Sequence, residues 1–91
     1  MKTRADILAE ASRLTTGDRN KSYGSVTDTH QRIADIWTTI LGHPVRADQV
    51  ALCMVGLKLA RLINTPNHLD SFIDGAAYMA IAGEIALEDK Q

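Results

Sequence analysis

The sequence has little of what defines several classes of protein. Its 91 residues include one cysteine, two prolines and four aromatic residues, and no apolar run approaches the ~18 residues of a membrane span. Cys53 alone cannot form an intrachain disulfide, and its place in the apolar run VALCMVGL predicts a buried thiol. The N-terminal segment MKTRADILAEASRL mixes charges with its apolar residues, so it has no signal-peptide core. We therefore expect a cytosolic protein with no membrane partner.

Neither sign of charge is in excess. Ten Lys and Arg residues nearly balance 11 Asp and Glu residues, which gives a net charge of −1 and an isoelectric point near 6.2. Because no global positive field attracts the chain to nucleic acid, we expect no nucleic-acid partner. The apolar fraction of 45% suffices for a core of aliphatic residues, and the length predicts one domain over residues 1–91.

Start and stop signals divide the chain into helices. Thr3 followed by Asp6 forms a capping-box-like start, and Ser25 with Asp28 gives a second start. The second helix carries one apolar face until Gly42 closes it. The pattern predicts two amphipathic helices joined by a polar loop.

Two further helices follow. The third opens at about Ala47 and is apolar nearly all round, so we expect it to lie centrally. The fourth runs to about residue 87 and starts either with Thr65 and Pro66 or with Asn67 and Asp70. No alternating strand pattern is present in the sequence, so it predicts an all-α fold. We expect a compact bundle of about four helices that ends in an antiparallel helical hairpin.

Four charges flank the turn of this hairpin. In an antiparallel register, Arg61 faces Asp70 and Lys58 faces Asp74. One interpretation is two interhelical ion pairs, each worth about 0.5 kcal/mol if exposed. The other is a ligand site, because arginine suits phosphate and two aspartates one turn apart can hold Mg²⁺. Spacing leaves both open.

A basic loop before the second helix is another candidate site. Arg19 and Lys21 lie near the start of that helix, where backbone amides favour an anion, and Tyr23 is placed to stack on a base or sugar. The alternative is a solvated loop whose Tyr23 packs on the bundle.

Two glycines, Gly75 and Gly83, lie inside the fourth helix, where each costs about 0.8–1 kcal/mol relative to alanine. They indicate close approach by a helix, a ligand or a second subunit. With a short chain of limited burial, they lead us to expect a homo-oligomer. Since no histidine spacing fits a metal and no nucleophile stands beside a recognisable base, we assign no metal ligands and no catalytic residues.

The order of four segments resembles a family of small all-helical proteins encoded by phages and prophages. They are DRNKSYGS, HQRIADIW, VALCMVGLKLARL and NHLDSFIDGAAY, which together cover about residues 17–80. In that family a glycine tends to precede the tyrosine, whereas Ala77 stands there in this chain. The resemblance implies a protein of the host bacterial cytoplasm.

That family is distantly similar to MazG-type all-α nucleoside triphosphate pyrophosphatases, which hold Mg²⁺ with carboxylates from two helices. The likeness implies that Asp70 and Asp74 match the later acidic pair. The Glu-x-x-Glu pair is missing, and the nearest acids are Asp28 and Asp35. Binding without turnover therefore fits the sequence better than hydrolysis.

The leading hypothesis is a non-enzymatic phage accessory protein that binds a small phosphorylated, nucleotide-like ligand and sequesters a defence signal. It requires no cofactor. The alternatives are a Mg²⁺-dependent nucleotide pyrophosphatase and a non-catalytic helical protein-interaction module. The candidate ligand-binding residues are Arg19, Lys21, Tyr23, Lys58, Arg61, Asp70, Asp74 and Tyr78.

Overall fold

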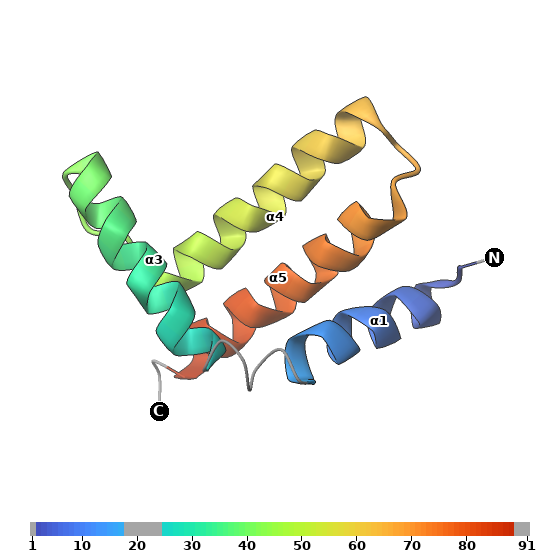
Figure 1. The fold of residues 1–91 in the computed structure, drawn as a ribbon, viewed down its shortest axis with the longest axis horizontal. Helices are drawn as coiled ribbons and strands as arrows, with labels where there is room; N and C mark the ends of the chain where they lie inside the picture. Colours follow the sequence, from blue (N-terminus) through green and yellow to red (C-terminus); the bar gives the residue numbers. More distant parts are fainter. Residues whose placement is uncertain (1, 18–24, 89–91) are drawn as a thin grey trace.

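The computed structural model describes residues 2–17 and 25–88, and within these ranges every regular element is a helix (Figure 1). The helices are α1 (Arg4–Thr16), α3 (Val26–Leu41), α4 (Ala47–Asn64) and α5 (Leu69–Glu88). Helices α4 and α5 form an antiparallel hairpin, α1 packs along α5, and α3 crosses the far end of the hairpin. The predicted all-α bundle with a C-terminal hairpin is confirmed.

The local signals for the first two helices work as predicted. At the start of α1, the Thr3 hydroxyl accepts from the Asp6 N–H at 3.2 Å, and the Asp6 carboxylate accepts from the Thr3 N–H at 3.0 Å. Ser25 caps α3 by accepting from the Asp28 N–H at 3.0 Å. Gly42 ends α3 in the left-handed region, with φ at 77°, where a side chain would be strained.

The start of α5 differs from both predicted caps. The Thr65 carbonyl accepts from the His68 N–H at 3.1 Å, and the His68 carbonyl accepts from the Ser71 N–H at the same distance. The chain thus makes one tight turn before the helix begins at Leu69. The two proposed starts, at residues 65–66 and 67, are wrong because Thr65 serves this turn and His68 opens the helix.

Two clusters of buried residues form the core, and α5 belongs to both. One joins the start of α4 to the end of α5 and consists of Ala47, Ala51, Ile81, Ala82 and Ile85. The other joins α1 to the first half of α5 and consists of Ala11, Ile73 and Ala77. The central helix is therefore α5.

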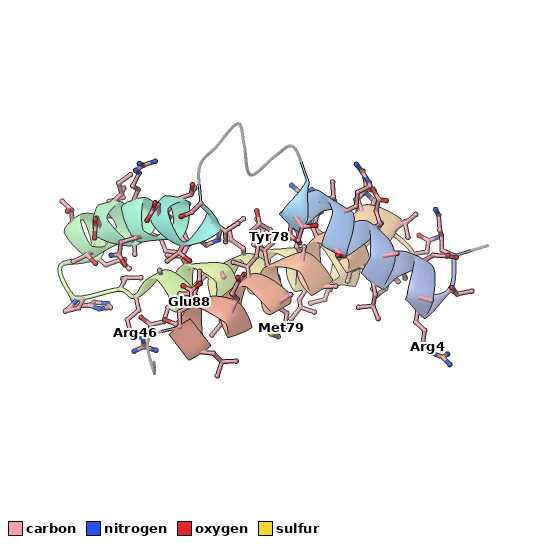
Figure 2. All side chains as sticks on the ribbon, turned by 90° about the horizontal axis from the view of Figure 1, so that it is seen from below. Arg4, Arg46, Tyr78, Met79 and Glu88 are labelled. Carbon is pink, nitrogen blue, oxygen red and sulfur yellow. The ribbon has the colours of Figure 1, made fainter. Side chains whose placement is uncertain are left out.

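Helix α4 is less enclosed than its composition predicts. Its buried residues all lie at its start, and none after Ala51 is buried. Cys53 is exposed, so the predictions of a buried thiol and a central third helix are wrong. In Figure 2, α1 and α3 lie on one side of the hairpin, with Tyr78 directed toward them and Met79 directed to the opposite side. An apolar helix buries only the sides that meet a neighbour, and α4 meets α5 along one side and α3 near its start.

Candidate polar groove at the hairpin turn

One of the two expected ion pairs forms in the hairpin. The Lys58 Nζ lies 3.4 Å from the Asp74 Oδ2, and the Lys58 side chain is only 13% exposed. This contact confirms the register for that pair. Because Lys58 is largely shielded from solvent and forms an ion pair with Asp74, its role is structural.

Arg61, one turn further along α4, has no such partner. Of the carboxylates that the structure describes, none lies within 4.0 Å of its guanidinium, and the exposed Asp70 forms no ion pair with a described cation. The predicted Arg61–Asp70 ion pair is wrong in this structure. The Lys58–Asp74 pair is therefore not followed by a second pair nearer the turn, and the Arg61 guanidinium is exposed to solvent.

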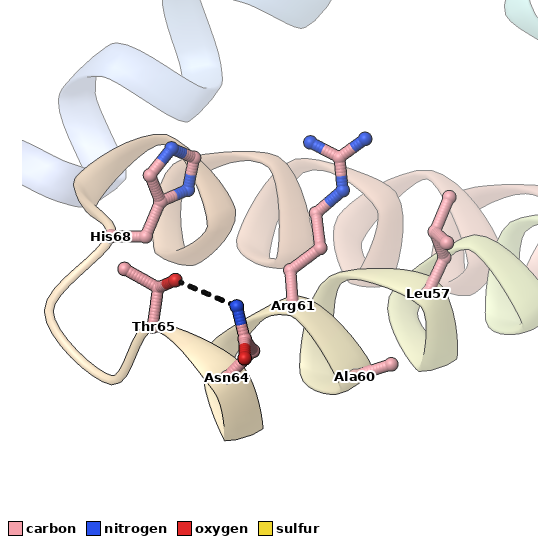
Figure 3. A pocket seen from close by; sticks show the side chains of 6 residues that line it. All are labelled: Leu57, Ala60, Arg61, Asn64, Thr65 and His68. Carbon is pink, nitrogen blue, oxygen red and sulfur yellow. Dashed lines mark hydrogen bonds between the residues drawn. The ribbon is translucent and has the colours of Figure 1, made fainter.

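An open groove of about 430 Å³ surrounds Arg61 at the turn. Figure 3 shows the Arg61 guanidinium and the His68 ring rising on the same side of the chain. The lining residues are Leu57, Ala60, Arg61, Asn64, Thr65 and His68.

Local hydrogen bonds hold the polar side chains of the groove. The His68 Nδ1 lies 2.8 Å from the hydroxyl of Ser71, which is 1% exposed. When that hydroxyl donates to Nδ1, the His68 Nε2 carries the proton and is a donor. The Asn64 amide donates to the Thr65 hydroxyl at 3.5 Å. The hydrogen bond to the buried Ser71 therefore fixes the orientation of the His68 ring.

The chemistry of the groove favours an anion. It contains a guanidinium, an amide, a hydroxyl and an imidazole, all of which can donate hydrogen bonds, and no acid lines it. Leu57 and Ala60 add an apolar side on which a flat or aliphatic part of a ligand can rest. Arginine forms bidentate hydrogen bonds with phosphate and carboxylate groups, which gives the groove a natural anchor.

The other predicted site residues are distributed differently. Arg19, Lys21 and Tyr23 lie outside the described residues. Tyr78 is half-buried against the core cluster at the start of α4. Its ring packs edge-on against the ring of His30, with 6.3 Å between the ring centroids. Among the predicted residues that the structure describes, Arg61 alone lines the groove.

Sequence reasoning missed Asn64, Thr65 and His68. Asn64 and Thr65 follow Arg61 by three and four residues, a spacing that places side chains on one side of a helix end. His68 lies beyond the end of α4, so its place in the groove depends on the turn and not on helical spacing.

Residues 2–17 and 25–88 contain neither a metal-binding cluster nor a membrane-spanning helix. No three His, Cys, Asp or Glu residues there gather as a group that could hold a metal ion. No helix in those ranges is both long and apolar enough to cross a membrane.

Fold and groove together define an all-α protein with a donor-lined groove at a helical turn. The chain belongs to the family described as Domain of unknown function (DUF6378), whose model matches residues 6–86. It is 40% identical over 72 residues to the Gene 55 protein of Mycobacterium phage D29, covering 79% of this chain and 48% of the relative. The Gene 55 protein of Mycobacterium phage L5 is 30% identical over 86 residues, covering 93% and 55%.

These relatives confirm the predicted phage protein family. The chain spans about half the length of the curated relatives it matches. No solved structure matches it. The likeness to MazG-type pyrophosphatases remains a prediction.

Proposed function

We propose that the protein binds a small phosphorylated, nucleotide-like ligand at the polar groove without turning it over. The observation that carries this proposal is Arg61, a cation that no described carboxylate neutralises, in a groove whose other polar groups are donors. A phage accessory protein with such a site would withdraw a signalling nucleotide of the host from solution.

The groove suggests a division of roles. Arg61 takes a phosphate through two parallel hydrogen bonds, and His68 adds a donor held in place by Ser71. Leu57 and Ala60 support the sugar or base. Lys58 is a weaker candidate for a phosphate contact than Arg61, because Asp74 already neutralises it.

Asp70 has a supporting role in this proposal. It is exposed in the first turn of α5 and pairs with none of the cations in residues 2–17 and 25–88, so we assign its carboxylate to accept from ribose hydroxyls or a base. Arg19, Lys21 and Tyr23 of the basic loop remain predicted phosphate and stacking contacts.

A thermal-shift panel of nucleotides, with and without Mg²⁺, identifies the ligand, because binding to the folded state raises the melting temperature. Calorimetry on the selected nucleotide then compares variants. Arg61→Ala is expected to cost about 1.5–3 kcal/mol of binding free energy, the scale of a charged hydrogen bond. Asp70→Asn should cost less.

Arg4→Ala is the matched control, because Arg4 is an exposed arginine on α1 that does not line the groove. It removes the same charge and should leave the affinity unchanged. Equal losses in Arg61→Ala and Arg4→Ala would reveal a non-specific charge effect and refute the groove.

Two results would favour the alternatives. Mg²⁺-dependent release of pyrophosphate, abolished by Asp70→Asn and only slowed by Arg61→Ala, would indicate a pyrophosphatase. No thermal shift with any nucleotide would favour the helical interaction module, which the exposed apolar residues of α4 and α5 support.

A further inference from the structure

A row of apolar residues follows the exposed side of each helix of the hairpin. On α4 it consists of Leu52, Gly56, Leu59 and Ile63, and on α5 of Phe72, Ala76, Met79 and Gly83. All of them are exposed except Ala76, which is partly buried against the core cluster that α5 shares with α1. Both rows follow steps of four, three and four residues, which keep side chains on one side of a helix. Leu59 is 58% exposed, Ile63 85% and Met79 53%, so these large side chains are far from buried.

The two rows lie beside each other. The Lys58–Asp74 contact fixes the register of the hairpin. The same register sets Leu59 near Phe72 and Leu52 near Met79. Figure 2 shows Met79 directed away from the side that α1 and α3 occupy. We call the eight residues of the two rows the bare face.

The composition of the bare face suits a helical partner. None of its residues is charged, which is unusual for an exposed surface of this extent. A Cβ added at Gly56 or at Gly83 would meet nothing within 4 Å, so packing within the chain does not require these glycines. Glycine inside a helix lowers its stability, and a short side chain lets another helix approach closely. Internal packing, one expectation for Gly83, therefore does not explain it.

The chain exposes more surface than a compact monomer of its mass is expected to expose. The chain exposes 6511 Å², whereas a folded monomer of 9.9 kDa is expected to expose about 5,200 Å². The excess of about 1,300 Å² exceeds the roughly 800 Å² that each partner buries in a standard stable interface. The chain as a whole therefore exposes more surface than one copy of a standard interface would cover.

We propose that the occupant is a second copy of this chain, packed hairpin on hairpin through the bare face. In a two-fold interface the same patch meets itself, so any charge on it would meet its like. An uncharged face avoids this repulsion, whereas a partner of different chemistry would be expected to leave complementary charges there. The predicted homo-oligomer is thus a dimer of hairpins, with α1 and α3 on its two outer sides.

Light scattering of the full chain at micromolar concentration tests the dimer. The expected mass is that of two 9.9 kDa chains. Leu59→Glu should give the mass of one chain, because the interface would then hold two facing carboxylates. Leu8→Glu is the matched control, since Leu8 is a 62% exposed leucine on α1 that does not belong to the bare face. It should remain a dimer.

A second variant separates a packed interface from general stickiness. Gly56→Leu adds apolar surface but blocks close approach, so it should shift the population toward the monomer. Circular dichroism should show unchanged helix content in all variants, because each replaced side chain is exposed or absent. Arg61→Ala should keep the dimer, so failure of the nucleotide proposal is distinguishable from failure of this one.

The sole cysteine reports where the two copies meet. Cys53 is exposed on α4 beside Leu52, and one spin label there gives one label per chain. Dipolar coupling between the two labels should appear in the labelled chain without substitutions and in labelled Leu8→Glu, and it should vanish in labelled Leu59→Glu. A single-chain mass for the unmodified protein, or a dimer that survives Leu59→Glu or breaks with Leu8→Glu, would overturn the proposal.

Discussion

The α4–α5 hairpin carries apolar residues at both ends, but α4 is enclosed at the end that α3 crosses and open toward the turn. At the end that α3 crosses, Ala51 is 0% exposed and Ile85 2% exposed. At the end near the turn, Leu57 is 45% exposed and Ile63 85% exposed. The sequence is apolar at both ends, so the difference comes from which neighbour arrives. Helix α3 covers one end, and α1 lies along α5 rather than α4.

This difference assigns separate tasks to the two ends. The closed end supplies much of the buried core and hence the stability of the fold. The end near the turn holds exposed apolar residues and the unpaired Arg61, so it has surface available for recognition. The comparison can be tested by making like substitutions at both ends.

The largest expected effect comes from the same change at each end. Ile85→Ala should lower the free energy of unfolding by about 2–5 kcal/mol, because it leaves a cavity in a closed site. Ile63→Ala should change it by less than about 0.5 kcal/mol when the chain is monomeric. Urea unfolding in the Leu59→Glu background, which is expected to be monomeric, measures both. Similar losses at the two positions would show that the end near the turn is enclosed after all.

The next effect uses two glycines and should have opposite signs. Gly42→Ala should destabilise the fold by about 1–2 kcal/mol, because Gly42 has a φ of 77°. Gly56→Ala should stabilise the monomer by about 0.5–1 kcal/mol, because nothing lies within 4 Å of the added Cβ and alanine favours a helix. Thermal unfolding of the same Leu59→Glu background resolves the signs. Destabilisation by both changes would contradict an open side at Gly56.

A smaller effect distinguishes the two predicted charge pairs. A double-mutant cycle on Lys58 and Asp74 should give a coupling of about 0.5–1 kcal/mol, because the pair is in contact and partly shielded. The equivalent cycle on Arg61 and Asp70 should give less than about 0.3 kcal/mol in the absence of ligand. A larger coupling for the second pair would mean that Arg61 is neutralised in solution and would weaken the groove proposal.

The smallest effect concerns pH and the start of α1. The Thr3 backbone N–H, and then its hydroxyl, hold the pKa of Asp6 below its usual value. A carboxylate with a lowered pKa stabilises the folded helix above its unfolded pKa, and this contribution is lost as pH falls through the folded value. NMR titration should show an Asp6 midpoint that moves upward in Thr3→Ala. An unchanged midpoint would mean that the capping box is not populated.

Local chemistry made part of this structure predictable. The starts at Thr3 and Ser25 and the stop at Gly42 follow from short-range hydrogen bonds and backbone preference, which the sequence displays directly. The register of the hairpin followed from complementary charges at Lys58 and Asp74. The fold class followed from helical periodicity throughout the described chain.

The rest depended on tertiary placement. Whether Cys53 is buried depends on which sides of α4 meet α5 and α3, and helical periodicity is silent where a helix is apolar all round. The roles of Asn64 and His68 depend on the tight turn that delays α5 until Leu69. Arg61 was predicted as a site residue, but spacing alone could not show that it forms no ion pair with Asp70.

The two core clusters share no residue, although α5 contributes to both. Helix α1 rests on α5, whereas α3 packs mainly on the start of α4, so the two helices are separate cooperative units, each held by its own set of contacts. Loss of one need not expose the core beneath the other, so partial opening is available well below the free energy of global unfolding. Amide hydrogen exchange should then resolve distinct protection levels: the α1 amides should exchange through a local opening that leaves the protection of α3, and of the end of α5 beneath it, unchanged.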